Sequence, residues 1–182
     1  MNKIIIVLFL LISCISFSQK KIWFTEKLCY NLSSDFQLNL EYEDRYSDFN
    51  LDYSHADFGT TYEIVDNLKL NLNGRVKRTF ENTEIIPHIS LEYKFWNFCI
   101  KPKYEFVENR FRFKMVYTQN INENICLYTS DEIFSDFETN RFMSGVIFKH
   151  DKLSLTLSYL LLTTYGVGYD HIAVFGTYFR FN

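Results

Sequence analysis

The chain has 182 residues, of which 47% are hydrophobic and 19% aromatic, and its 19 basic and 22 acidic residues give a formal net charge of −3. This length fits one domain, and the near balance of charge argues against a protein that binds nucleic acid by neutralising phosphates. The 19 Phe and 13 Tyr, beside only 6 Gly and 2 Pro, favour β-structure, because aromatic side chains suit pleated, half-buried surfaces.

The first segment of the chain has the pattern of a secretory signal peptide. Lys3 provides a positive charge, and residues 4–12 form an uninterrupted apolar run. A helix that spans a bilayer needs about 20 apolar residues, so this run is too short to span but has the length of a signal-peptide core. We therefore expect the protein to be exported.

The predicted cleavage site follows this apolar run. Small residues at Ser16 and Ser18 predict cleavage after Ser18, which gives a signal peptide over residues 1–18 and a single mature domain over residues 19–182. Cys14 leaves a second interpretation open, in which a lipoprotein box directs lipidation of that cysteine. A barrel needs no such second anchor, so cleavage after Ser18 is the favoured interpretation.

Beyond residue 19, apolar and polar residues alternate in short segments. The segments with the strictest alternation are residues 36–43, 68–73, 89–95, 111–115 and 153–159. Successive side chains of a strand point to opposite faces, so each segment has one apolar and one polar face. Short polar breaks separate the segments, and longer breaks are predicted at residues 47–56, 135–138 and 165–170. The pattern predicts an all-β, antiparallel, up-and-down transmembrane β-barrel.

The strand number is constrained by parity. Eleven candidate strands can be counted, but a barrel with both ends in the periplasm needs an even number. The segment at residues 22–32 is the weakest candidate, because Glu26 interrupts its apolar face. Either this segment is not a full span or a further strand lies within residues 47–56, so we expect about 10–12 strands.

The direction of the apolar face separates two kinds of barrel. A soluble barrel places its apolar face inside, whereas a membrane barrel turns that face toward lipid. Tyrosines lie near the ends of several apolar faces, among them Tyr42, Tyr93 and Tyr159. Aromatic girdles of this kind are typical of membrane barrels, which favours the second interpretation.

The last predicted strand also favours a membrane barrel. Ala173, Phe175, Phe179 and Phe181 share one face of it. This alternation resembles the closing strand that the barrel-assembly machinery reads, although Asn182 stands where a terminal Phe is expected. We therefore expect a location in the outer membrane of a Gram-negative bacterium. The expected partners are membrane lipid and, through the strand from Ala173 to Phe181, the assembly machinery.

Short motifs of aromatic and polar residues recur along the mature chain. They are Trp23, residues 109–114, residues 131–134, residues 140–142 with Gly145, and residues 171–175. These motifs resemble those of a family of small uncharacterised outer-membrane proteins, the domain of unknown function 2490. The resemblance implies an outer-membrane barrel and no established activity.

The polar face predicts a narrow lumen lined by charged side chains. The candidate lumenal residues are Glu92, Lys94, Lys101, Lys103, Glu105, Arg110, Arg112 and Lys114. A wide aqueous channel needs about 16–18 strands, so these charges share a small space. One interpretation is a plug of ion pairs. The other is a pore with a weak preference for anions, because basic residues outnumber acidic ones between residues 69 and 114.

No catalytic motif or cofactor fingerprint is present in the sequence. Histidines and carboxylates lie in or beside predicted outer loops, namely His55, Asp57, Asp170 and His171. A hydrolytic site at the outer rim would also need a nucleophile such as Ser54 or Ser135 within hydrogen-bond reach. Rim residues of these types are more often solvated, so we expect no enzymatic activity and no catalytic residues.

Cysteines and histidines give no metal-binding pattern. Cys29, Cys99 and Cys126 are predicted to face inward near the periplasmic end, where two of them could pair. Cys and His do not have the spacing of a zinc site, so we expect neither a metal nor another cofactor.

The sequence thus predicts a non-catalytic outer-membrane barrel with a structural or narrow-pore role. It predicts no nucleic-acid partner and specifies no small-molecule ligand. Two alternatives remain open: a soluble periplasmic barrel that binds an apolar ligand inside, and an outer-membrane hydrolase with its site at the rim.

Overall fold

The computed structural model describes residues 21–78, 83–136 and 138–181. The predicted signal peptide, its cleavage site after Ser18 and Cys14 lie outside these residues. The described residues form eleven strands and no helix. The strands are β1 (Lys21–Asn31), β2 (Phe36–Ser47), β3 (Asn50–Val65), β4 (Leu68–Arg78), β5 (Thr83–Phe95), β6 (Phe98–Glu105), β7 (Arg110–Asn120), β8 (Ile125–Phe134), β9 (Thr139–His150), β10 (Leu153–Thr164) and β11 (Gly168–Phe181).

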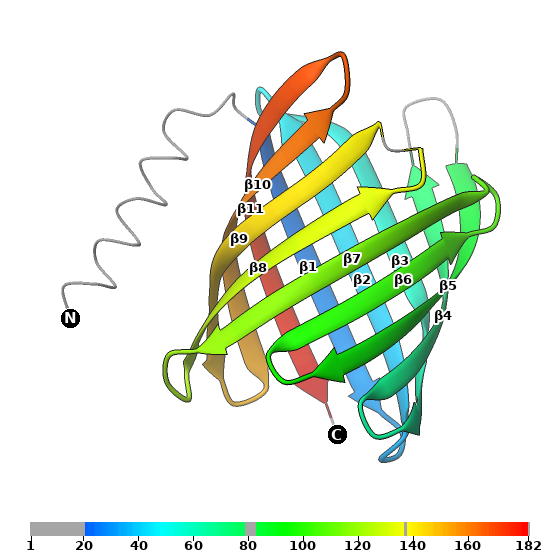
Figure 1. The fold of residues 1–182 in the computed structure, drawn as a ribbon, viewed down its shortest axis with the longest axis vertical. Coiled ribbons are helices and arrows are strands. Elements are labelled where there is room, and N and C mark those ends of the chain that lie inside the picture. Colours follow the sequence, from blue (N-terminus) through cyan, green and yellow to red (C-terminus); the bar gives the residue numbers. More distant parts are fainter. Residues whose placement is uncertain (1–20, 79–82, 137, 182) are drawn as a thin grey trace.

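These strands close into one barrel in which each strand pairs with its neighbours in the sequence, as Figure 1 shows. Every pairing is antiparallel except the closing one, where β1 and β11 run parallel with Lys21 opposite Ile172 and Tyr30 opposite Phe181. A chain that reverses at each turn returns in its starting direction after an odd number of strands. The parallel seam is therefore a direct result of the count.

The expectation of an even strand number is wrong for the described residues. The doubtful segment at residues 22–32 forms a full strand, because β1 is hydrogen-bonded along its length to both β2 and β11. Glu26 still points outward from this strand and is exposed. Residues 47–56 hold neither a further strand nor a long loop, since β2 and β3 are joined by Asp48 and Phe49 alone.

The connections between strands are short at both ends of the barrel. Those whose residues are all described contain two to four residues, so the longer breaks predicted at residues 47–56 and 165–170 are not loops of that length. Several two-residue turns use a left-handed backbone, with φ of 49° at Asp48 and 65° at Phe49. Hairpin turns of two residues need positive φ values, because these match the right-handed twist of the strands.

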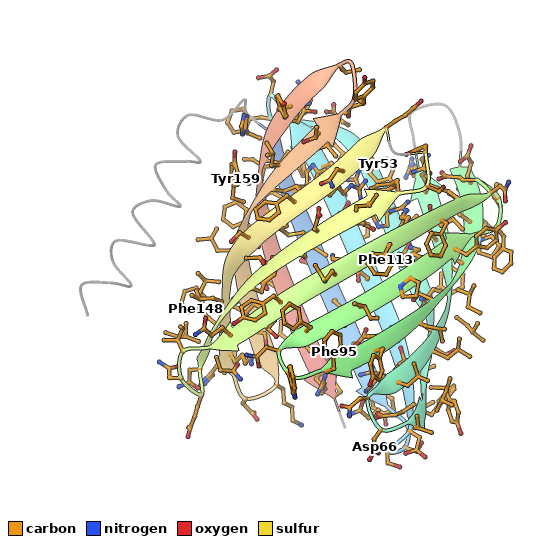
Figure 2. The ribbon with its side chains drawn as sticks, viewed as in Figure 1. Tyr53, Asp66, Phe95, Phe113, Phe148 and Tyr159 are labelled. Atoms are coloured by element: carbon orange, nitrogen blue, oxygen red, sulfur yellow. The ribbon has the colours of Figure 1, made fainter. Side chains whose placement is uncertain are left out.

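The strand pattern separates an apolar outer face from a polar inner face. Large apolar side chains such as Phe24, Leu40 and Phe58 are about half exposed on the outside. Figure 2 shows Phe113 and Tyr159 among the side chains carried on the barrel wall. Polar residues at the alternate positions are buried in the lumen. A soluble barrel with an apolar interior requires the reverse orientation.

One part of the inner face departs from this rule. We call it the apolar wall; it comprises Trp23 of β1, Met143 of β9, Leu160 and Leu162 of β10, and Ile172 and Val174 of β11. Leu160 is fully buried, and Ile172 is 1% exposed. The inward positions at the start of β10 therefore carry hydroxyl groups, whereas those further along the same strand carry leucines. These leucines belong to a small hydrophobic core inside the lumen, next to the parallel pairing of β1 and β11.

Candidate lumenal site

The barrel encloses a cavity of about 440 Å³ that residues from all parts of the wall line. This volume lies within the range of about 300–1,000 Å³ that small-molecule pockets occupy. Arg112 and Lys114 of β7 lie on its lining, as do Trp23 and Val174 of the apolar wall. The lining of the cavity thus includes both charged and apolar side chains.

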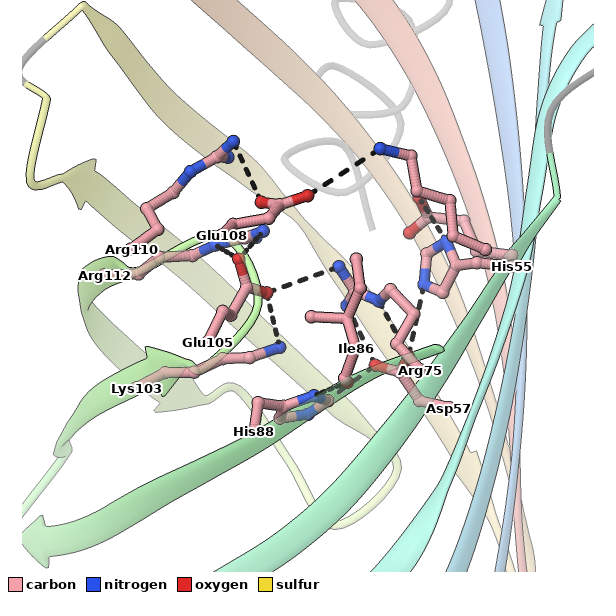
Figure 3. Close-up of polar contacts among 12 residues, drawn as sticks. His55, Asp57, Arg75, Ile86, His88, Lys103, Glu105, Glu108, Arg110 and Arg112 are labelled. Atoms are coloured by element: carbon pink, nitrogen blue, oxygen red, sulfur yellow. Dashed lines mark hydrogen bonds and ion pairs between the residues drawn. The ribbon is translucent and has the colours of Figure 1, made fainter. Parts of the chain in front are cut away.

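Glu105 is the centre of the charged side. Its side chain is almost fully buried and lies at the end of β6. Arg112 donates to its Oε2 from Nη2 at 2.6 Å and from Nε at 3.0 Å, while Lys103 Nζ lies 3.3 Å and Arg75 Nη1 3.6 Å from Oε1 (Figure 3). A buried carboxylate is tolerated only when paired and hydrogen-bonded, so these three cations make its burial possible.

Arg75 of β4 links Glu105 to a second carboxylate, Asp57 of β3. The guanidinium donates from Nε to Oδ1 of Asp57 at 2.7 Å and from Nη2 to Oδ2 at 2.8 Å, which is the bidentate geometry that favours arginine. His55 and His88 are buried on either side, with Nε2 atoms 4.0 Å and 3.9 Å from Asp57 (Figure 3). The network therefore spans three strands of the wall before it reaches Glu105.

The β6–β7 ladder brings like charges face to face. Lys101 lies directly opposite Lys114, and Lys103 lies directly opposite Arg112. All four side chains line the cavity, and we call them the basic tetrad. Like charges directly opposite on neighbouring strands destabilise a sheet, so this arrangement is maintained against a local electrostatic cost.

Two further carboxylates neutralise part of this charge. Glu132 of β8 lies 3.8 Å from Arg112 Nη1 and 3.5 Å from Arg141 Nη1. Glu92 of β5 lies 3.4 Å from Lys101 Nζ. Lys114 has no ion pair within 4 Å to any described residue, although it faces Glu132 across the ladder. It is the member of the tetrad without an ion pair to a described residue inside that distance, and Glu132 is the carboxylate opposite it.

Trp23 joins the apolar wall to the charged side. The Arg45 guanidinium lies 4.0 Å and the Arg141 guanidinium 5.6 Å from the Trp23 ring centroid. A cation over an aromatic face is attracted by the ring quadrupole. The indole therefore serves as a surface that both apolar and cationic neighbours can pack against.

Comparison with known proteins gives one decisive result. The model of a protein family described as "Protein of unknown function (DUF2490)" matches residues 20–170 of the chain. The chain belongs to this family. The comparison with curated proteins gave no match.

A solved structure offers a weaker likeness. A chain from a study entitled "Unveiling the Mechanism Behind the in-meso Crystallization of Membrane Proteins" is 13% identical over 84% of this chain and 72% of its own length, with a TM-score of 0.48. No helix among the described residues is long and apolar enough to cross a membrane, a finding that does not bear on crossing by strands.

The predicted lumenal residues of this DUF2490 chain fall into three groups. Lys101, Lys103, Arg112 and Lys114 line the cavity, and Glu105 is buried behind them. Glu92 connects Lys101 to Lys94, whose side chain is 52% exposed. Arg110 lies 3.0 Å from Glu108 beside the connection between β6 and β7, away from the cavity lining. The structure thus brings five of the eight together and leaves the other three outside the cavity.

Several residues of the site were not among the predicted ones. His55 and Asp57 were expected in an outer loop but lie within β3 and face the lumen, because the chain turns earlier, at Asp48. Arg75 belongs to the polar face of its strand, but its bidentate partner could not be predicted without the β3–β4 register. Glu132 and Arg141 lie within the family motifs, which was the one available signal for them.

The rim pair considered in the sequence is separated by the fold. Asp170 and His171 are consecutive residues of β11, so their side chains point to opposite faces of the wall. Asp170 pairs with Lys21 at 2.8 Å, whereas His171 bonds to the hydroxyl of Tyr159. These two residues therefore cannot act together as base and orienting group.

The cysteines Cys29, Cys99 and Cys126 are all free in the structure. Cys29 donates from its thiol to Oδ1 of Asn39 at 3.0 Å. Glu41, His55 and Asp57 place one possible metal-ligand atom each within 4.8 Å of one another. Arg75 already occupies both oxygens of Asp57, so this group is better suited to its ion pair than to a metal ion.

Proposed function

We propose that this DUF2490 protein is an outer-membrane β-barrel of a Gram-negative bacterium with a structural or narrow-pore role and no catalytic activity. It would be exported by the signal peptide and cleaved after Ser18. The mature domain would then cross the membrane with its strands. The fold and the family membership are established above, and the membrane location and the role are what we add to them here.

The observation that carries this proposal is the apolar outer face. Side chains such as Leu72, Ile85 and Leu155 expose 51%, 64% and 45% of their surface around the barrel. In water an apolar surface of this extent, interrupted by Glu26 on β1, would be a strong liability for aggregation, whereas in a bilayer it would contact lipid. Most strands have 10 to 16 residues, and a tilted spanning strand needs about 9–11.

The lumen supports a closed or narrow passage. Eight basic and four acidic side chains line the cavity, and Figure 3 shows how several of them cross-link neighbouring strands. These ion pairs restrict the lumen to a cavity of about 440 Å³. The basic excess supports a weak preference for anions if the lumen conducts.

The closing strand supports insertion by the assembly machinery. Phe175, Phe179 and Phe181 of β11 point outward and are exposed at 37%, 37% and 45%. They form the alternating aromatic face that such machinery would bind. Membrane lipid would contact the same face after insertion.

The alternatives are weaker on geometric grounds. A soluble barrel that binds an apolar ligand would need the apolar face inside, but the interior is lined mainly by charged and polar groups. A rim hydrolase would need Asp170 and His171 on one face, and they lie on opposite faces. No second function is therefore favoured by a specific observation.

The proposal is tested by fractionation and gel mobility. Cells that express the protein are separated into periplasm, inner membrane and outer membrane, and each fraction is run on a gel with and without boiling. We expect the protein in the outer membrane, with the unboiled form migrating faster because the closed barrel resists detergent. Recovery in the soluble periplasm without a heat shift would overturn the proposal. If the protein is recovered in the outer membrane with a heat shift, its conductance in a planar bilayer separates the narrow-pore role from the structural one.

A further inference from the structure

The basic tetrad carries more positive charge than the carboxylates beside it neutralise. Two like-charged pairs follow one another along the β6–β7 ladder, Lys101 opposite Lys114 and Lys103 opposite Arg112. Repulsion between such pairs opposes folding unless an anion lies between them. Glu92, Glu105 and Glu132 approach the tetrad from its edges, so three carboxylates face four cations, and Arg75 and Arg141 share two of the three. Lys114 lies opposite Glu132 but has no ion pair to a described residue within 4 Å.

The lumen also contains buried donors without acceptors. The hydroxyl of Ser90 and Nε of Arg141 are buried and have no hydrogen-bond partner in the structure. Ser90 lies directly opposite Lys103 on the β5–β6 ladder, and both residues line the cavity. Oε1 of Glu105, at the edge of the tetrad, is an acceptor that is likewise buried without a hydrogen bond. All three atoms are closed off from the cavity, so they show that the polar interior is incompletely paired and do not mark the position of a ligand.

The apolar wall borders the same cavity. Among the residues on its lining, Met143 is partly exposed and Trp23 and Val174 each keep 7% of their surface exposed, whereas Leu160 is fully buried. An inorganic anion would satisfy the tetrad but would leave this surface unused. A ligand with an anionic group and an apolar body would contact both.

We propose that the lumen binds a small organic anion, with its carboxylate or a similar oxyanion on the basic tetrad and its apolar body against Met143 and the exposed part of Trp23. The tetrad supplies the positive charge, and these two side chains supply the apolar contact. This inference goes beyond the proposed function, since the site is defined by the lumen and depends neither on membrane location nor on conductance.

The test measures binding to the folded full-length barrel in detergent by isothermal titration calorimetry. The probes are benzoate, benzyl alcohol and inorganic phosphate, which supply charge with an apolar ring, the ring alone, and charge alone. We expect saturable binding of benzoate at one site per barrel, with the other two probes at least about tenfold weaker. Absence of saturable benzoate binding would overturn the site, and equal binding of benzyl alcohol or of phosphate would overturn its mixed character.

A pair of variants locates the binding. Lys114→Gln removes the member of the tetrad that has no ion pair to a described residue within 4 Å, and Lys94→Gln removes a lysine outside the cavity. We expect Lys114→Gln to weaken benzoate binding about tenfold, because one charge-assisted contact is lost, and Lys94→Gln to leave it unchanged. Cold and boiled gel mobility shows that each variant is folded. Equal affinity in wild type and Lys114→Gln, or an equal loss in both variants, would place the ligand elsewhere and refute the assignment.

Trp23→Leu tests the apolar half of the site. The substitution keeps an apolar side chain but removes the flat indole surface. We expect it to weaken benzoate binding several-fold while the weak phosphate binding stays as in wild type. A loss that is the same for both probes would show that Trp23 acts only through the fold, which contradicts its role as a ligand surface.

Discussion

The two sides of the lumen are stabilised in different ways. The apolar wall, on β1 and β9–β11, is a small hydrophobic core in which each buried side chain contributes by itself. The charged side, on β3–β8, is a network in which Glu105, Arg112 and Arg75 each depend on the others. The outer face is apolar on both sides. The difference shows that alternation along each strand determines which positions face inward. Whether those positions carry apolar or charged side chains differs from strand to strand.

The difference has consequences for mutation. A buried ion network is strongly destabilised when one member is removed, because the remaining charges stay buried without compensation. A hydrophobic cluster loses the transfer free energy of the removed atoms and gains a cavity. The substitutions below separate these two responses, from the largest expected effect to the smallest.

Glu105→Gln gives the largest expected loss. It keeps the shape of the side chain but removes the negative charge that pairs with Arg112, Lys103 and Arg75. We therefore expect the free energy of unfolding to fall by about 3–5 kcal/mol. Urea unfolding in lipid vesicles, followed by gel mobility, measures the change. Glu84→Gln is the matched control, since that side chain is 52% exposed and its substitution should have no resolvable effect. Similar losses in both variants would show that the network contributes no more than a surface pair.

Leu160→Ala tests the apolar wall. Leu160 is fully buried against Trp23, Ile172 and Val174, so its truncation should cost about 2–5 kcal/mol through lost burial and a new cavity. The same unfolding assay measures it. Leu155→Ala, on the outer face of the same strand, provides the comparison and should cost less, because no enclosed cavity forms. An equal cost at both positions would mean that the wall is not a packed core.

Leu157→Arg tests the outer face common to both sides. Leu157 lies in the middle of β10, opposite Phe175, and points away from the lumen. If this face contacts lipid, an arginine near the midplane should cost about 2–4 kcal/mol and reduce insertion. Ser154→Arg, on the inner face near the barrel end, should insert nearly as well as wild type. Normal insertion of Leu157→Arg would contradict the membrane-facing assignment.

Lys114→Gln gives the smallest effect. The substitution removes repulsion from Lys101 on one side and attraction to Glu132 on the other, so in the absence of ligand we expect a change of less than about 1 kcal/mol. The urea midpoint should stay close to that of the wild type with an unchanged slope. A large loss of stability would show that the attraction to Glu132 outweighs the repulsion from Lys101.

The faces of the strands could be predicted from the sequence because they depend only on a period of two. Lys101, Lys103, Arg112 and Lys114 were assigned to the lumen by this rule, and the structure places them there. The rule assigns a face to each residue but cannot predict its partners. Partners depend on register, and the bidentate contact of Arg75 with Asp57 follows from a β3–β4 alignment that no local pattern encodes.

The positions of the turns were also predicted incorrectly from the sequence. The polar residues at 47–56 suggested a long loop, but positive φ values at Asp48 and Phe49 close the hairpin in two residues. The earlier turn draws His55 and Asp57 into the sheet and so into the buried network. The same segment raised the prospect of a twelfth strand. The parity argument excluded a count of eleven because it assumed that both ends of the chain lie on the same side of the barrel.

The parallel seam between β1 and β11 gives the molecule a polarity. Since both strands run in one direction, Lys21 and Phe181 lie at opposite ends of the barrel. In a membrane, a tag placed just before Lys21 and a tag placed after Phe181 would be displayed on opposite sides. An even-stranded barrel would display both tags on the same side.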